Sequence, residues 1–286
     1  MQLKFPKNPM KTIVTHLSVD LDCITSTWLV KRFFPDWDDA QVVFTPQQVN
    51  WNNIVPDSDA NILYVDTGYG KFDHHQINEH TCASRRIYTY LLEKNLVESR
   101  LTLALGRLIE YINDVDNFAD VNYPDPTADR YDFCLHQLIT GLKKTIGKDE
   151  EIVQVVYKLL DGALELLKNK TRAESEIKKG YVFHSKWGKT LAMNTGNDEA
   201  VRLSQKMGFE LVVTKDPQKG FVRIKTPPNP RLDLTPLYEK IKEKDKTGYW
   251  FLHILKNMLL NGSSVTPDVK PSPLTLQQVI EIIKGI

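Results

Sequence analysis

The chain has 286 residues and 41% of them are hydrophobic, which is enough for the cores of two modest domains or one large one. Its 37 basic and 36 acidic side chains give a formal net charge of +1, which excludes the overall basic character of a protein that tracks along long nucleic acids. Three widely spaced cysteines without a CxxC pair argue against a disulfide framework and a zinc ribbon. No run of about 18 apolar residues occurs, so we expect a cytoplasmic protein without membrane contact.

The first half of the chain alternates short apolar runs with amphipathic stretches. Residues 12–15 and 41–45 are predicted strands, and residues 26–34 between them are a predicted helix, which makes a βαβ pattern. Residues 61–66 are the next buried strand, followed by predicted helices at 84–94 and 101–113. This order predicts an α/β fold with a doubly wound, mostly parallel sheet.

The second half begins with a predicted helix at residues 152–168, after which the charged run 168–179 is expected to be a solvated helix or a linker. Predicted strands follow at residues 181–183, 190–194, 211–214 and 221–225, and predicted helices at 234–244 and 251–260. We therefore divide the chain into a first domain at 1–165, a connecting segment at 166–180, and a smaller α/β domain at 181–286 that closes over the cleft.

Two adjacent histidines are the most informative feature of the sequence. His74 and His75 follow the third predicted strand by one short turn, and Asp73 precedes them, where its carboxylate could hold one imidazole in the ligating tautomer. His16 directly follows the first predicted strand and Asp66 ends the third. Ligands of open α/β sheets gather at the carboxyl ends of strands, so these side chains are expected to share one site.

Carboxylates accompany the histidines in numbers that suggest metal binding. Asp20, Asp22, Asp66 and a later aspartate would carry four negative charges, which two divalent cations bridged by a carboxylate would neutralise. A hydroxide held between the two metals could attack phosphorus in line with the leaving group. Mixed imidazole and carboxylate ligands favour manganese, cobalt or iron over magnesium, and we expect two Mn²⁺ ions, with Mg²⁺ or Co²⁺ as alternatives.

These residues resemble the DHH phosphoesterase superfamily, which includes RecJ-type exonucleases, nanoRNases, cyclic-dinucleotide phosphodiesterases and family II inorganic pyrophosphatases. The first three family motifs stand here, in order, as His16, Asp20 and Asp22, then Asp66, then Asp73, His74 and His75. The fourth, a further aspartate, is assigned to Asp116 with Asp114 as the alternative. The segments VDTGYGKFDHHQ, ASRRIYTYL and INDVDNF look most like the exonuclease branch named for a melanocyte proliferating gene.

The resemblance implies a role for each motif residue. One metal would be bound by His16, Asp20 and Asp66, and the other by Asp22, Asp66, His74 and Asp116, so that Asp66 bridges them. His75 would meet the substrate phosphate, which places Asp66, His75 and Asp73 among the catalytic residues. Taken singly, these residues have plainer roles: Asp20 and Asp22 alone would be an N-cap and turn pair before a helix.

The substrate-binding half departs from the family. Many members close the site with a Gly-Gly-Gly-His segment in a second domain, and this sequence has no such glycine run. Residues 248–253 stand at the corresponding place and end in His253. This histidine would pack in a helix core as readily as it would contact substrate. Tyr249 and Trp250 could stack a base or belong to the core. The candidate substrate-binding residues are Arg85, Arg223, Lys225, Arg231 and His253.

The sequence thus predicts a hydrolase of phosphodiester bonds, a phosphodiesterase or exonuclease acting on short single-stranded oligonucleotides or dinucleotides. The first alternative is a pyrophosphate or polyphosphate hydrolase, which would need a dense cluster of basic residues and no aromatic platform. The second is a catalytically silent nucleotide-binding module, which the complete set of ligand types in the first three motifs disfavours. Preference for RNA, DNA or cyclic dinucleotides, cleavage polarity and assembly as a homodimer remain open.

Overall fold

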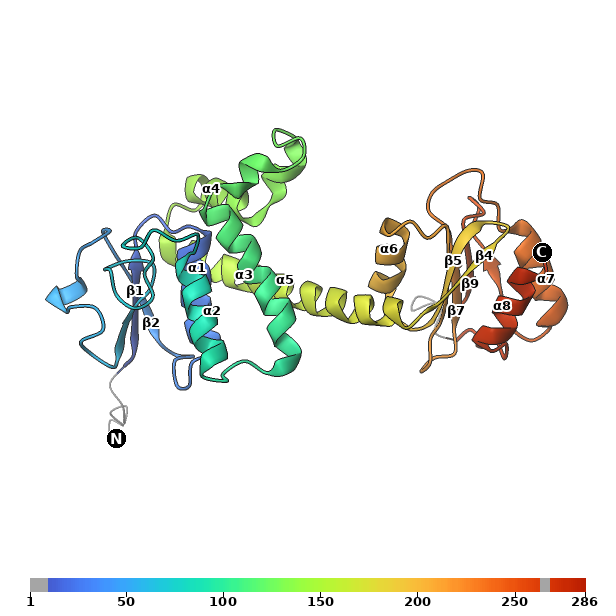
Figure 1. Cartoon of the computed structure of the whole chain (residues 1–286), viewed down its shortest axis with the longest axis horizontal. Helices are drawn as coiled ribbons and strands as arrows, with labels where there is room; N and C mark the ends of the chain where they lie inside the picture. Colours follow the sequence, from blue (N-terminus) through green and yellow to red (C-terminus); the bar gives the residue numbers. More distant parts are fainter. Residues whose placement is uncertain (1–9, 263–267) are drawn as a thin grey trace. The chain divides into compact units, whose positions relative to one another are not determined.

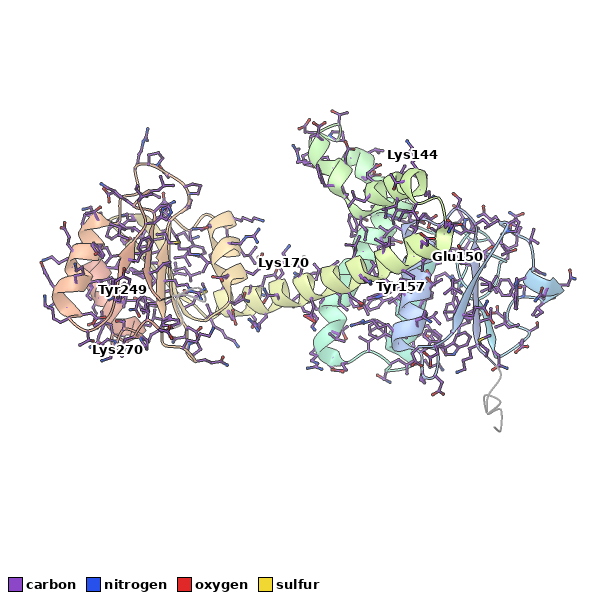
Figure 2. The ribbon with its side chains drawn as sticks, turned by 180° about the vertical axis from the view of Figure 1, so that it is seen from behind. Lys144, Glu150, Tyr157, Lys170, Tyr249 and Lys270 are labelled. Carbon is purple, nitrogen blue, oxygen red and sulfur yellow. The ribbon has the colours of Figure 1, made fainter. Side chains whose placement is uncertain are left out.

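The computed structural model describes residues 10–262 and 268–286 (Figure 1). The chain forms two compact units that divide between Lys168 and Asn169. The division lies inside the long helix α5 (Asp149–Lys178), within the segment expected to connect two domains. Figure 2 labels Tyr157 on the first-unit part of this helix and Lys170 on its second-unit part. Among the described residues, no helix combines the length and apolarity needed to cross a bilayer.

The first unit contains a parallel sheet of three strands, β1 (Thr12–His16), β2 (Gln41–Thr45) and β3 (Ile62–Tyr64), in the order β2-β1-β3. Apolar residues of β1 are fully buried, as expected for a central parallel strand. Val14 pairs with Tyr64, so His16 and Asp66, each two residues further on, follow at neighbouring strand ends. The sheet therefore brings the first two motifs together at its carboxyl edge.

Helices cover this sheet and enclose one hydrophobic core, in which Ile24, Leu29, Ile87 and Leu105 are fully buried. Helix α1 begins at Leu21 and not at Ser26 as predicted, because Asp20 caps its first turn. The helices of this unit besides α5 are α1 (Leu21–Phe33), α2 (Ala83–Glu93), α3 (Ser99–Asp116) and α4 (Leu135–Thr145), with short 3-10 turns η1 (Trp51–Asn53), η2 (Ala119–Asn122) and η3 (Asp129–Phe133).

The second unit is built on a mixed sheet whose six described strands have the order β4-β5-β6-β7-β9-β8; β5 and β6 pair in parallel and the other neighbours pair antiparallel. Helices α7 and α8 share one core with the sheet, and α6 and the end of α5 share a second. The bounds are β4 (Tyr181–Ser185), β5 (Gly188–Asn194), α6 (Asp198–Lys206), β6 (Leu211–Lys215), β7 (Val222–Lys225), α7 (Thr235–Lys244), β8 (Phe251–Leu252), β9 (Met258–Asn261) and α8 (Leu276–Lys284). The predicted α/β class is confirmed.

The helix predicted for residues 251–260 is wrong, since these residues form the hairpin β8–β9. Leu252 and Leu259 pair across the hairpin and pack in the core, while His253 and Lys256 turn between the strands. Lys256 has a left-handed φ of 56°, which ends any regular helix. The apolar residues at the two ends of the segment suggested a helix, but its middle residues make a turn.

Candidate metal centre

His16 is fixed at the end of β1 with one ring nitrogen directed at carboxylates. Its Nδ1 lies 2.9 Å from the carbonyl oxygen of Leu17, a contact in which Nδ1–H donates. Its Nε2 lies 3.2 Å from Oδ2 of Asp66 and 3.5 Å from Oδ2 of Asp20. A backbone acceptor on one nitrogen leaves the other to ligate a metal, which is the usual arrangement of metal-binding histidines.

Asp20 performs its plainer role as well. Its Oδ1 accepts a hydrogen bond of 2.9 Å from the backbone N–H of Cys23, so that it caps α1. The other oxygen remains directed at His16. Capping therefore does not compete with the metal-binding role, because the two carboxylate oxygens serve different partners.

Asp22 is buried in the first turn of α1 and reaches the start of α2. Its two oxygens accept hydrogen bonds from the backbone N–H groups of Ala83, at 2.7 Å, and Ser84, at 2.9 Å. These donors belong to the unpaired first turn of α2, whose dipole favours a negative charge. Burial, followed by repulsion from Asp66 and Asp116, nevertheless raises the pKa of Asp22 to about 8.

His74 lies among three carboxylates. Its Nε2 is 3.2 Å from Oδ1 of Asp66, 3.6 Å from Oδ2 of Asp116 and 4.0 Å from Oδ2 of Asp22. Burial and repulsion from Asp66 raise the pKa of Asp116 to about 6, against the attraction of His74. Asp116, at the end of α3, is the aspartate that reaches this group, whereas Asp114 is absent from the ligand groups found among the described residues.

Among the described residues the potential ligands form three groups, and Asp66 belongs to two of them. It lies with His16, Asp20 and the thiol of Cys23 in one group and with His74 and His75 in another. The third group contains Asp22, His74 and Asp116 and adjoins Asp66 through His74. The ligand atoms in each group lie within 4.8 Å of one another, and His16 and His74 approach different oxygens of Asp66.

Asp66 is a buried acid with one oxygen that lacks a hydrogen bond. It is 2% exposed, and its Oδ1 lies 3.2 Å from Nε2 of His74 but accepts no hydrogen bond. A buried carboxylate oxygen without a hydrogen bond is costly unless a cation compensates it. Divalent cations fit this donor set, because they would satisfy the free oxygen and relieve the repulsion that raises the pKa values of Asp22 and Asp116.

Asp73 orients His75 and not His74. It accepts hydrogen bonds from His75 Nδ1 at 2.7 Å and from the Tyr69 N–H at 2.6 Å. Burial opposes ionisation of Asp73, but these bonds lower its pKa to about 2, so it carries a full negative charge. Nε2 of His75 lies 3.0 Å from the amide nitrogen of Gln47, a residue that the sequence did not single out. His75 is thus held from both sides.

Two further residues that the sequence did not single out clamp the loop before Asp20. Asp149 accepts hydrogen bonds from the backbone N–H groups of Ser18 and Val19, at 2.8 and 3.2 Å. Lys143 donates to the carbonyl oxygen of Ser18 at 3.0 Å. These contacts join residues more than a hundred positions apart, so no local pattern could have revealed them.

The predicted substrate-binding residues belong to both units of the chain. Arg85 forms an ion pair of 3.1 Å with Glu110 on the first unit. Arg223, in the second unit, pairs with Asp198. Lys225 shares strand β7 with Arg223, and Arg231 lies in the exposed loop before α7. His253 lies in the β8–β9 turn.

Trp250 cannot serve as a stacking platform. It is 5% exposed and its indole N–H donates to Asp245 at 2.8 Å, so it belongs to the core of the second unit. Its neighbour Tyr249 is 63% exposed. The aromatic pair that the sequence suggested is therefore reduced to one accessible ring.

Comparison of the chain with protein-family models and with curated proteins finds no match. The geometry of the carboxylates and histidines and the motif resemblance in the sequence are therefore the indications of function that this chain offers.

Proposed function

We propose that this chain is a divalent-metal-dependent phosphodiesterase that hydrolyses short oligonucleotides or dinucleotides. The observation that carries the proposal is that Asp66 lies both with His16 and Asp20 and with His74 and His75, at the carboxyl ends of β1 and β3. A shared carboxylate between two sets of imidazole and carboxylate ligands is the arrangement that two-metal phosphoesterases use. The resemblance to the DHH phosphoesterases rests on the same residues and supports the same chemistry.

Each residue has a definite task under this proposal. His16 and Asp20 would hold one cation, Asp22 with His74 and Asp116 a second, and Asp66 both. Two such cations, for which the mixed nitrogen and oxygen donors favour manganese, would activate water and neutralise the charge of a phosphate group.

His75 has a separate task. Because Asp73 accepts from its Nδ1, the ring is held beside Asp66, 3.8 Å from Oδ1, where it can contact a phosphate oxygen. In the structure Nε2 accepts from the Gln47 amide; the bond to Asp73 raises the pKa of His75, and protonation at Nε2 would displace that amide and let the ring donate to a phosphate oxygen.

The balanced net charge of +1 agrees with a short substrate, since long nucleic acids are usually held by an extended basic surface. The two alternatives are a phosphoanhydride hydrolase and a silent nucleotide-binding module. Both keep the fold, so they differ from the proposal only in what the site turns over.

A substrate panel tests the proposal. Manganese-dependent release of nucleotide or phosphate would be measured from linear dinucleotides, short 5′-phosphorylated DNA and RNA, and pyrophosphate. The wild-type chain would be compared with Asp66→Asn and with Asp114→Asn, a matched control two residues before Asp116 in α3 that lies outside the described ligand groups.

We expect mononucleotide release that Asp66→Asn abolishes and Asp114→Asn leaves within about twofold. Phosphate from pyrophosphate alone would replace the proposal with the phosphoanhydride hydrolase. Absence of turnover on every substrate with manganese, cobalt and magnesium would replace it with the silent module.

A further inference from the structure

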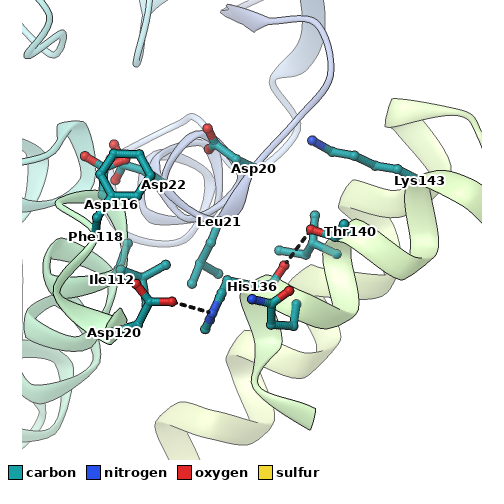
Figure 3. Close-up of a pocket in the computed structure, with 13 residues that line it drawn as sticks. Asp20, Leu21, Asp22, Ile112, Asp116, Phe118, Asp120, His136, Thr140 and Lys143 are labelled. Atoms are coloured by element: carbon teal, nitrogen blue, oxygen red, sulfur yellow. Dashed lines mark hydrogen bonds and ion pairs between the residues drawn. The ribbon is translucent and has the colours of Figure 1, made fainter. Parts of the chain in front are cut away.

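A cavity of about 350 Å³ opens beside the candidate metal centre. Asp20, Asp22 and Asp116 contribute to its lining, and Figure 3 shows helix α4 with His136 and Lys143 across from them. Its volume lies in the range of about 300 to 1,000 Å³ that is typical of small-molecule sites. Three carboxylates therefore belong both to the candidate metal centre and to the wall of this cavity.

Phe118 also lines the cavity and has an unusual conformation. It lies two residues after Asp116, its φ is 57°, in the left-handed region, and the residue is 76% exposed. A bulky residue is rarely found with positive φ, and such strain is concentrated at functional sites. The exposed aromatic ring beside the carboxylates leaves a π face available to a ligand.

The opposite wall holds a rigid imidazole. His136 Nδ1 lies 2.9 Å from the hydroxyl of Tyr111, and its Nε2 lies 3.5 Å from Oδ2 of Asp120. Burial raises the pKa of Tyr111, so the phenol keeps its proton and donates to Nδ1. Both ring nitrogens are engaged within the protein, and the imidazole therefore shapes the cavity wall.

The remaining lining combines apolar surface with free polar groups. Ile112 and Ile139 are buried and apolar, and Gln137 is exposed, with an amide that can both donate and accept hydrogen bonds. The lining as a whole is mixed, because aspartates and Lys143 share it with these apolar side chains, and its exposed aromatic ring suits a flat heterocycle. Pyrophosphate, which is small and fully charged, would leave this cavity unused.

We infer that the cavity binds the nucleoside whose phosphate lies at the carboxylate centre, with Phe118 as the platform on which its base stacks. This inference rests on the proposed function and assigns the side chain that holds the base of its substrate. Stacking of a base on an aromatic side chain tolerates any base, so the cavity selects nucleosides over inorganic phosphates without requiring a sequence.

The inference is tested by comparing the kinetics of a substrate that has a base with those of a substrate that lacks one. A dinucleotide and its abasic analogue would be compared on wild type, Phe118→Ala and Phe118→Trp, with Phe133→Ala as a control that removes an equally exposed ring, 78% exposed, outside this cavity. We expect Phe118→Ala to raise the KM for the dinucleotide about tenfold, within the roughly 5- to 150-fold that loss of one stacked base produces. Phe118→Trp and Phe133→Ala should stay within about twofold of wild type.

The abasic analogue should show no such dependence on residue 118. Equal losses of Phe118→Ala on both substrates, or a fall in kcat without a change in KM, would overturn the stacking role. Melting temperatures of the variants would show that they fold, which is expected because the ring is exposed.

A second readout does not need turnover. Saturation-transfer NMR with adenosine 5′-monophosphate and the metal-free protein in EDTA should detect the base protons on wild type and Phe118→Trp, with signal reduced at least about fivefold on Phe118→Ala. Undiminished transfer to Phe118→Ala would overturn the inference. If the wild type bound the base in this way but cleaved no phosphodiester, the proposed function would fail while the nucleoside site stood.

Discussion

Two buried aspartates, one in each unit, show opposite ways of accommodating a carboxylate. Asp66 in the first unit is 2% exposed and Asp245 in the second is 4% exposed. Asp245 accepts hydrogen bonds from the backbone N–H of Gly248, the indole of Trp250 and the hydroxyl of Ser272, at 2.6 to 2.8 Å. Asp66 leaves Oδ1 without a hydrogen bond.

The difference separates an acid that the fold stabilises from one that we propose is functional. Bonds to Asp245 lower its pKa to about 2 despite burial, so the folded protein itself stabilises this charge. Around Asp66 other acids gather, and burial and mutual repulsion raise the pKa values of Asp22 and Asp116. A bound cation would compensate the negative charge that the fold leaves uncompensated in this cluster. Removal of one of these acids should therefore affect function more than folding.

The largest expected effect concerns function. Asp66→Asn should lower manganese-dependent phosphodiester cleavage at least about a thousandfold, about 4 kcal/mol in the barrier, because both metals lose a shared ligand. The same change should alter the free energy of unfolding of the metal-free chain by less than about 1 kcal/mol, since it removes repulsion. Steady-state kinetics and urea unfolding in EDTA measure the two quantities. Strong destabilisation without metal would make Asp66 a structural acid like Asp245.

The converse effect is expected in the second unit. Asp245→Asn should lower the free energy of unfolding by about 3 kcal/mol, because an amide cannot accept all the hydrogen bonds that the carboxylate receives. Urea denaturation followed by tryptophan fluorescence measures the loss, with the exposed Asp268→Asn as the control. A change below about 0.5 kcal/mol would remove the contrast between the two acids.

The sequence predicted the acid cluster of the first unit, but it did not predict the role of Asp245 in the second. The spacing of His16, Asp66 and His74 along strand ends was enough to bring them together, because parallel strands place their carboxyl ends at one edge. The start of α1 was placed too late, since the capping role of Asp20 was hidden among the motif residues.

Other features depend on tertiary contacts that no local pattern contains. Asp149 reaches Ser18 across more than a hundred residues, and Gln47 reaches His75 from a loop after β2. Residues 251–260 combine apolar ends with a turn, and only pairing with β7 decides that they form strands. Phe118 carries no sequence signal for its left-handed conformation.

Metal should stabilise one unit and not the other. Manganese at about one hundred times its Kd should add about 2.7 kcal/mol per site to the stability of the first unit, by mass action. Hydrogen exchange read separately for residues 10–168 and 169–262 measures this, and Asp66→Asn should abolish the gain. Equal protection of both units would contradict the assignment of the ions to the first.

The smallest expected effect is a pH dependence in the second unit. The pKa of Asp245 is about 2 when folded and about 3.9 when unfolded, so its contribution is fully present above pH of about 4. On the order of 2 kcal/mol should be lost as the pH falls from about 4 to about 2. Urea unfolding across this range should show the loss in wild type and a flatter profile in Asp245→Asn. An identical slope in the variant would assign the acid sensitivity to other carboxylates.

The most direct test of the central claim is the electron paramagnetic resonance of the chain titrated with Mn²⁺. Two ions held by one carboxylate lie about 3.5 to 4 Å apart, close enough for exchange coupling. We predict two manganese ions per chain with a coupled spectrum that Asp66→Asn converts to uncoupled ions or to free manganese. Binding of a single uncoupled ion by the wild type, or of none, would contradict a metal pair built around Asp66.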